Sequence, residues 1–362
     1  MPPANNPDLS VTELKAYALR EPVSRRAYTI LEARTKAGLT GYGDCSAAPP
    51  EALAQARLST TGQPATSYEV ISRQLSAYPA MQAAVVMALL DITGKYAKSP
   101  LYQTLGGPTR NKARAITPLA GATDAELLTS MKRAQEAGHR AFLVPTPGPA
   151  AANQGQAFVK ATRARLETLR AQAGPEVDFV LDGAGRLTPG DSASLASSLE
   201  RFHLLWFDEP CRISNISTLH KIAAETVTPL GFGRRVHQGG AFQDLLRDQA
   251  IDILRPSLAL NGLSQLRRMA ALAEPYYTAI APYHDGGPVA TAAALHLAAS
   301  LPNFFIQQVP FTEAAEDRAM RAGLGGAALE RPVNGFLALP TGPGLGLALD
   351  RATLEKYQER AA

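Results

Sequence analysis

Three charged side chains follow one another along the chain at equal spacing. Asp182, Asp208 and Arg234 stand 26 residues apart at each step, and each lies at or next to the end of an apolar run typical of a strand. If each step is one strand–helix unit, all three side chains project to one mouth of a parallel barrel. Two carboxylates brought together repel each other, and a guanidinium between them removes that repulsion with donors whose geometry fits carboxylates. The spacing therefore predicts ion pairs from Arg234 to Asp182 or Asp208. The alternative is that Arg234 points into solvent while the carboxylates bind water or cap loops.

Other polar residues near these strand ends allow two interpretations each. Glu209 is either a site residue or the partner in a loop salt bridge. Arg186 is either an anion clamp or a solvated loop charge. The three histidines His139, His203 and His237 have no metal-ligand spacing to one another, which argues against a zinc site.

The elements that must position these residues form a regular alternation from about residue 113 onward. Eight segments have the apolar character of strands: 114–119, 141–146, 178–182, 204–208, 229–233, 252–257, 278–282 and 304–308. Helical patterns lie between most of them: 124–137, 149–173, 191–201, 216–226, 241–249 and 263–273. Eight such units in about 200 residues are typical of a (β/α) barrel of the TIM type. A doubly wound sheet is the competing fold, but no G-x-G-x-x-G motif follows the first strand.

The first hundred residues have a different pattern. Strands are predicted at 9–17 and 28–36, a turn and short strand at 38–43, and a helix buried nearly all round at 81–96. Three strands followed by helices indicate a small α+β domain. We expect residues 1–112 to form a capping domain and 113–320 the barrel. The Gly/Pro-rich passage at 340–346 suggests that 321–362 packs back on the cap.

Composition excludes several classes of protein. The 362 residues carry a formal charge of +4, with Lys and Arg spread along the chain, so no nucleic-acid-binding surface is indicated. No apolar stretch approaches the roughly 20 residues of a membrane helix. The first residues, MPPANNPD, do not read as a signal peptide, and Cys45 and Cys211 are expected to be reduced. We expect a cytoplasmic location.

Several motifs, in order, resemble the mandelate racemase and muconate lactonizing branch of the enolase superfamily. The N-terminal region contains GLTGYGD at 38–44, ALLDITGK at 88–95 and PLYQTLGG at 100–107. The barrel region contains LDGAGR at 181–186 and WFDEP at 206–210, and the tail contains PTGPGLGLALD at 340–350. The stretch 187–308 is most similar to the acid-sugar dehydratases of that branch. The resemblance implies a barrel with an α+β cap, assembled as a homo-oligomer.

The resemblance also implies a site chemistry. Members of the branch remove a proton α to a carboxylate, and a magnesium ion held by three carboxylates stabilises the enediolate. Two of those ligand positions fall on Asp182 and Asp208, and the third falls on Arg234, which cannot be a ligand. We therefore expect no magnesium at the family site and no other cofactor.

The acid–base positions of the family are altered as well. The second strand ends in LVPT at 143–146 without a basic pair, Ser257 replaces an Asp, and Gln308 replaces an acid. The family histidine falls on Tyr283 or His284, and both are candidate catalytic residues. Arg234, Arg186 and Glu209 are the candidate substrate-binding residues.

Two functions remain open from the sequence. In one, the protein is a lyase or a racemase/epimerase acting on a small carboxylate such as a sugar acid, with Arg234 supplying the positive charge of the metal. In the other, it is a non-catalytic member that binds a ligand or has a regulatory role.

Overall fold

The computed structural model describes residues 8–148, 155–212, 217–237, 240–347 and 349–359. The expected lead-in at 1–7, the first part of the expected helix 149–173 and the last three residues of the tail lie outside these ranges. In the part of the chain described, no helix has both the length and the apolar character needed to cross a membrane.

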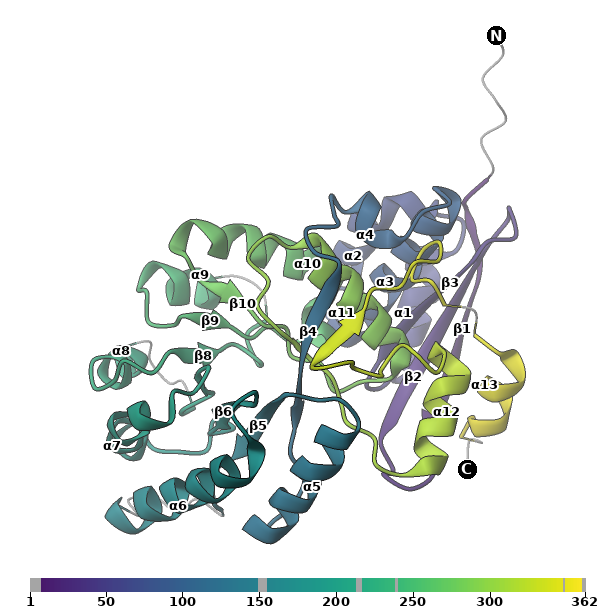
Figure 1. Cartoon of the computed structure of the whole chain (residues 1–362). Coiled ribbons are helices and arrows are strands. Elements are labelled where there is room, and N and C mark those ends of the chain that lie inside the picture. Colours follow the sequence, from purple (N-terminus) through teal and green to yellow (C-terminus); the bar gives the residue numbers. More distant parts are fainter. Residues whose placement is uncertain (1–7, 149–154, 213–216, 238–239, 348, 360–362) are drawn as a thin grey trace.

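The N-terminal region folds into a three-stranded antiparallel sheet with helices packed against it (Figure 1). Its elements are β1 (Val11–Arg20), β2 (Ala27–Thr35), β3 (Thr40–Cys45), α1 (Pro50–Thr60), α2 (Tyr68–Gln74) and α3 (Pro79–Tyr96). Helix α3 packs against β3 on one side and against a barrel helix, α10 (Leu258–Ala273), on another. This double packing explains why α3 has no single apolar stripe and is buried along most of its length.

A parallel barrel follows the short helix α4 (Leu101–Thr104). Within the described residues, eight parallel strands form the ring: β4 (Lys112–Pro118), β5 (Ala141–Pro145), β6 (Asp178–Asp182), β7 (Phe207–Asp208), β8 (Leu230–Phe232), β9 (Ile253–Leu254), β10 (Ala279–Ile280) and β11 (Gln307–Gln308). Strand β11 pairs with β4, and a bridge from Ile280 to Phe304 closes the ring. The predicted fold class, a barrel with an α+β cap, is confirmed.

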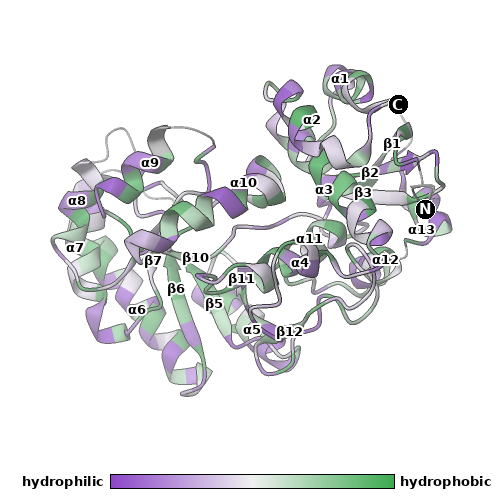
Figure 2. Ribbon diagram, turned by 90° about the horizontal axis from the view of Figure 1, so that it is seen from above, coloured by the Kyte–Doolittle hydropathy of each residue, from purple (hydrophilic) through white to green (hydrophobic). Residues whose placement is uncertain are grey.

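Helices surround this ring and shield its strands from water. They are α5 (Asp124–Glu136), α6 (Gly155–Ala173), α7 (Pro189–Leu199), α8 (Ser217–Ala223), α9 (Gly240–Arg247), α10, α11 (Pro288–Ser300) and α12 (Ala315–Gly325). Figure 2 shows α6 to α9 on the side of the barrel away from the cap, and α10 and α11 next to the cap helices. The barrel interior is filled by alternating residues of successive strands, including Ile116, Leu143, Val180 and Trp206.

The C-terminal segment touches both parts of the molecule. Strand β12 (Phe336–Ala338) pairs antiparallel with β4 of the barrel. Helix α13 (Arg351–Tyr357) contacts β1, and the Glu359 amide donates to the Ala18 carbonyl at 2.8 Å. Between them, buried Asp91 of α3 accepts from the amides of Leu345 at 2.7 Å and Tyr42 at 3.0 Å. This carboxylate thereby joins α3, β3 and the Gly/Pro-rich passage.

Candidate functional site: an ion-pair cluster at the barrel mouth

The three equally spaced residues meet at the carboxyl ends of β6, β7 and β8. Asp182 lies opposite Asp208 in the ladder between β6 and β7, and Arg234 follows the end of β8. The Arg234 Nη1 donates to Asp182 Oδ2 at 3.0 Å, and its Nη2 donates to Asp208 Oδ2. The predicted ion pair is therefore present, and the guanidinium bridges both carboxylates.

A second arginine, which sequence reasoning missed, holds Asp208 from the other side. Arg255 follows β9, is completely buried, and places Nε 3.1 and 3.2 Å from the two Asp208 oxygens. Its terminal nitrogens donate to the Ala281 carbonyl at 2.7 Å and to Gln308 Oε1 at 2.5 Å. The signal for this role was available in the sequence. An arginine next to an apolar strand of a barrel needs an anion if it is to be buried.

The indole of Trp206 completes the surroundings of Asp208. Its Nε1 donates to Asp208 Oδ1 at 2.8 Å, and the Arg255 guanidinium lies 5.2 Å from the indole ring. Gly231 of the next strand makes room for this arrangement. A Cβ atom on Gly231 would lie 2.4 Å from Trp206 Nε1 and 2.8 Å from Asp208 Oδ1. Only glycine at position 231 is compatible with this geometry.

Glu209 fixes the backbone that carries Arg234. Its Oε1 accepts from the amides of Gly233 and Arg234, each at 2.8 Å. Burial, and then the neighbouring Asp208 carboxylate, raise the pKa of Glu209 above its ordinary value. In the structure the Glu209 carboxylate thus holds the loop after β8 in place through two backbone hydrogen bonds.

The two arginines respond differently to this environment. Burial lowers the pKa of Arg234, but Asp208, Asp182 and Glu209 together outweigh that effect and raise it. For Arg255, burial dominates and lowers the pKa despite the pull of Asp208. A guanidinium stays charged in proteins in both cases. The cluster therefore balances two fixed cations against the carboxylates it contains.

These residues do not match what magnesium requires. The ion takes oxygen ligands in near-octahedral geometry and is commonly held by carboxylates. Here one oxygen of Asp182 and one of Asp208 both accept from the Arg234 guanidinium, which occupies the space between them. Across the described ranges, no three residues among His, Cys, Asp and Glu are grouped so that they could hold a metal ion.

The two candidates for the family histidine point to different places. The ring centroid of Tyr283 lies 5.1 Å from the Arg234 guanidinium carbon, and its hydroxyl donates to Asp285 at 2.7 Å. His284 is buried, accepts from the Gly286 amide through Nδ1 at 3.2 Å, and places Nε2 2.9 Å from Thr291 Oγ1. Tyr283 thus belongs to the cluster, and His284 fastens the loop to α11.

Of the remaining predicted residues, one contacts the cluster and the others do not. Arg186 is exposed, and its guanidinium forms no hydrogen bond or ion pair with the residues that the structure describes. Gln308 serves as the partner of Arg255, and the Ser257 carbonyl accepts from Asn261 Nδ2 at 3.1 Å. Gln308, where the resemblance implies an acid, therefore makes a structural contact with Arg255.

The amino-acid sequence matches two family models and several known proteins. The family model for the mandelate racemase / muconate lactonizing enzyme N-terminal domain matches residues 17–106, and the enolase C-terminal domain-like model matches residues 126–353. A D-galactonate dehydratase of Verminephrobacter eiseniae (strain EF01-2) is 32% identical over 287 residues, covering 76% of this chain and 73% of the relative. A D-galactonate dehydratase family member of Streptomyces bingchenggensis (strain BCW-1) is 31% identical over 302 residues, covering 76% and 72%.

Solved structures share the fold at lower identity. A mandelate racemase/muconate lactonizing enzyme from Sulfitobacter sp. superposes with a TM-score of 0.85 at 23% identity, covering 97% of this chain and 96% of the other. A mandelate racemase/muconate lactonizing enzyme-like protein from Rubrobacter xylanophilus DSM 9941 gives 0.85 at 24% identity, covering 98% of each chain.

Proposed function

The chain belongs to the mandelate racemase and muconate lactonizing branch of the enolase superfamily, and from that premise we propose that it binds a small sugar acid without magnesium. The class of ligand is supported by relatives above 30% identity that are named for D-galactonate. Assembly into a homo-oligomer and a cytoplasmic location stay predictions.

One observation carries the proposal: the Arg234 guanidinium lies between Asp182 and Asp208 and bonds to both. Removing a proton α to a carboxylate creates a dianion, and a divalent ion stabilises it with two charges. Arg234 offers one charge, and the two carboxylates beside it already use that charge. An enediolate at this mouth would therefore lack the stabilisation on which the reaction of the branch depends.

The acid–base groups support the same conclusion. Burial, followed by the neighbouring Asp285 carboxylate, raises the pKa of Tyr283 well above its ordinary value, so this hydroxyl is a poor base at neutral pH. His284 is turned away into the interface with α11. Gln308 and Ser257 have no side chain that takes up a proton near neutral pH.

A second candidate function is a lyase of altered chemistry, and the placement of Tyr283 favours it. Its ring lies against the Arg234 guanidinium and its hydroxyl remains protonated, so this side chain could donate a proton to a departing hydroxyl group. Loss of water from a sugar acid also removes the α-proton, which the Asp285 carboxylate beside Tyr283 would accept and then return to the phenol, and the resulting enol would rearrange to a 2-oxo acid.

Calorimetry and a product assay separate these functions. We expect D-galactonate, or a related aldonate, to bind equally well with magnesium and with EDTA, and to give no 2-oxo acid after prolonged incubation. Product formation in EDTA that is lost in Tyr283→Phe would favour the lyase. Turnover that requires magnesium would contradict the proposal.

A further inference from the structure

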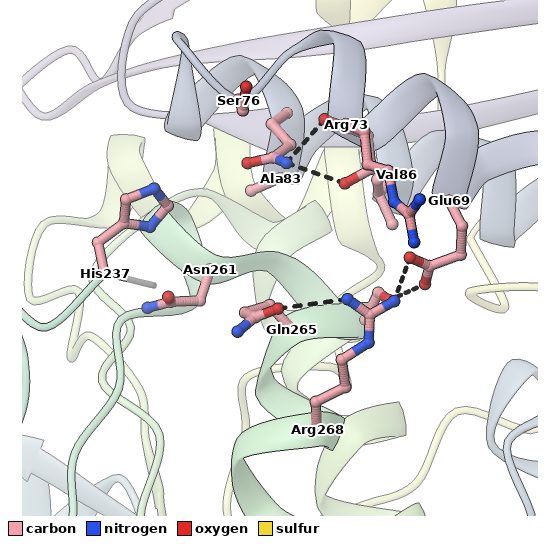
Figure 3. Close-up of a pocket in the computed structure, with 12 residues that line it drawn as sticks. Glu69, Arg73, Ser76, Ala83, Val86, His237, Asn261, Gln265 and Arg268 are labelled. Atoms are coloured by element: carbon pink, nitrogen blue, oxygen red, sulfur yellow. Dashed lines mark hydrogen bonds and ion pairs between the residues drawn. The ribbon is translucent and has the colours of Figure 1, made fainter. Parts of the chain in front are cut away.

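A polar cavity lies between the cap and the barrel, beside the cluster but separate from it. It is bounded by α2 and α3 on the cap side and by α10 and the loop after β8 on the barrel side (Figure 3). Its volume is about 470 Å³, within the range that small-molecule sites occupy. His237 in its wall is three residues beyond Arg234, so the loop that carries the cluster also forms part of this cavity.

A break in α10 creates the barrel side of the cavity. Gly262 has φ 63° and ψ 176°, which interrupts the helix directly after Asn261. A Cβ atom on Gly262 would lie 3.0 Å from the Ala83 Cα of α3, so glycine also permits the two helices to approach. The break leaves Asn261 on a separate first turn, facing the loop after β8.

Asn261 presents a buried acceptor that lacks a partner among the described residues. The residue is 8% exposed, and its Nδ2 donates to the carbonyls of Val236 at 3.2 Å and Ser257 at 3.1 Å. Neither Asn261 Oδ1 nor the nearby His237 Nδ1 has a hydrogen-bond partner in the described structure. A buried polar atom left unpaired is costly, which points to a donor supplied from the cavity.

Among the described residues that line the cavity, one cation has no carboxylate partner. Glu69 is paired with Arg268 and also accepts from the Ser264 hydroxyl. Arg73 also lines the cavity, and no ion pair of its guanidinium is recorded in the described ranges. The floor contributed by Ala83 and Val86 is apolar. A ligand suited to this lining has one negative charge, several hydroxyl groups and a short carbon backbone.

We propose that this cavity, and not the ion-pair cluster, is where the sugar acid binds. The carboxylate pairs with Arg73, a hydroxyl donates to Asn261 Oδ1, and further hydroxyls bond to His237 and Gln265. The terminal nitrogens of Arg234 and Arg255 are already engaged by protein partners, whereas Arg73 is available. The class of ligand rests on the proposed function, and the place of binding rests on the cavity.

Protection of an introduced thiol tests the place of binding. Ser76→Cys adds a thiol at the exposed rim of the cavity. The native Cys45 and Cys211 are both buried, so they should react slowly with a thiol reagent. With D-galactonate at ten times its calorimetric dissociation constant, labelling of Ser76→Cys should slow about tenfold, because only free protein reacts. Labelling of Ser197→Cys, at an exposed position of α7, should not change.

The possible results separate the two proposals. If D-galactonate binds by calorimetry but protects neither thiol, the ligand lies elsewhere and the cavity assignment is wrong, while the proposed function stands. If no aldonate binds at millimolar concentration, the ligand class itself is wrong and the cavity assignment falls with it.

A charge variant provides an independent check on the same site. Arg73→Gln should weaken D-galactonate binding about tenfold, the value of a charge-assisted hydrogen bond. Binding of galactitol, the uncharged counterpart, should change less than about twofold in the same variant. Arg73 is exposed, so folding should be unaffected. Equal losses for both ligands, or for neither, would contradict the assignment.

Discussion

Arg234 donates a 3.0 Å hydrogen bond to Asp182, although the strands that carry the two residues are separated by β7. The bond therefore spans the barrel mouth over Asp208, which Arg234 also contacts. A cation held at this point by three strands does the electrostatic work of an ion, because it keeps the two carboxylates from repelling each other. Unlike a bound metal ion, the guanidinium is covalently part of the chain and cannot dissociate.

Replacing Arg234 should destabilise the protein. Arg234→Met leaves Asp182 and part of Asp208 without a counter-charge, and we expect the free energy of unfolding at pH 7 to fall by about 2–3 kcal/mol. The side chains of Arg234 and Asp182 are 15% and 19% exposed, so water offsets part of the loss. Urea unfolding at pH 7, followed by the fluorescence of Trp206, the single tryptophan, measures the difference between the variant and the wild-type protein.

The neighbouring residue supplies the control for that experiment. Arg235 lies on the same loop and is exposed, and Arg235→Met should change stability by less than about 0.5 kcal/mol. Equal effects of the two substitutions, or no effect of Arg234→Met, would show that the bridge contributes nothing to folding.

Adding one methyl group at position 231 should disrupt the cluster. In Gly231→Ala the new carbon would lie 2.2 Å from Trp206 Cδ1, so the indole and Asp208 must move. We expect a loss of about 2–3 kcal/mol from this overpacking. Gly190→Ala is the matched control, because nothing lies within 4 Å of its added carbon in the first turn of α7, and alanine favours the helix. Similar behaviour of the two variants would argue against the tight packing around Asp208.

His284 should remain neutral throughout the physiological range. Burial first, and then the Arg321 guanidinium, lower its pKa to about 4, although Asp285 and Glu330 act in the opposite direction. The unfolded chain takes up this proton near pH 6.5, so the histidine's contribution to stability is present above pH 6.5 and is lost as the pH falls towards 4. NMR of the ring nitrogens should find no titration of His284 between pH 5 and 8. A midpoint near 6.5 would contradict the buried placement and revive His284 as an acid–base candidate.

The sequence predicts the fold well because strand ends and spacing are strong signals. The equal steps between Asp182, Asp208 and Arg234 correctly place them at one mouth, since each step is one strand–helix unit of the barrel. The helix α11 is absent from the sequence-based assignment. All of its residues are buried, so it has no polar face and no helical period to detect.

The directions of side chains in loops could not be predicted from the sequence. Tyr283 and His284 are adjacent, and the strand before them, β10, is only two residues long, so alternation cannot decide which one faces Arg234. The Gly262 break and the unpaired Asn261 Oδ1 depend on how the cap meets α10, which is a long-range contact. No local pattern encodes such a contact.

The replacement of the metal by Arg234 is tested most directly by calorimetric titration of magnesium into the wild-type protein, with Arg234→Glu beside it. Arg234→Glu restores three carboxylates at adjacent strand ends, so it should bind magnesium at millimolar concentration or below, and Asp182→Asn in that background should abolish the binding. We expect no binding heat in the wild-type protein, because the guanidinium occupies the site and repels the cation. Magnesium binding by the wild-type protein that disappears in Asp182→Asn would contradict it.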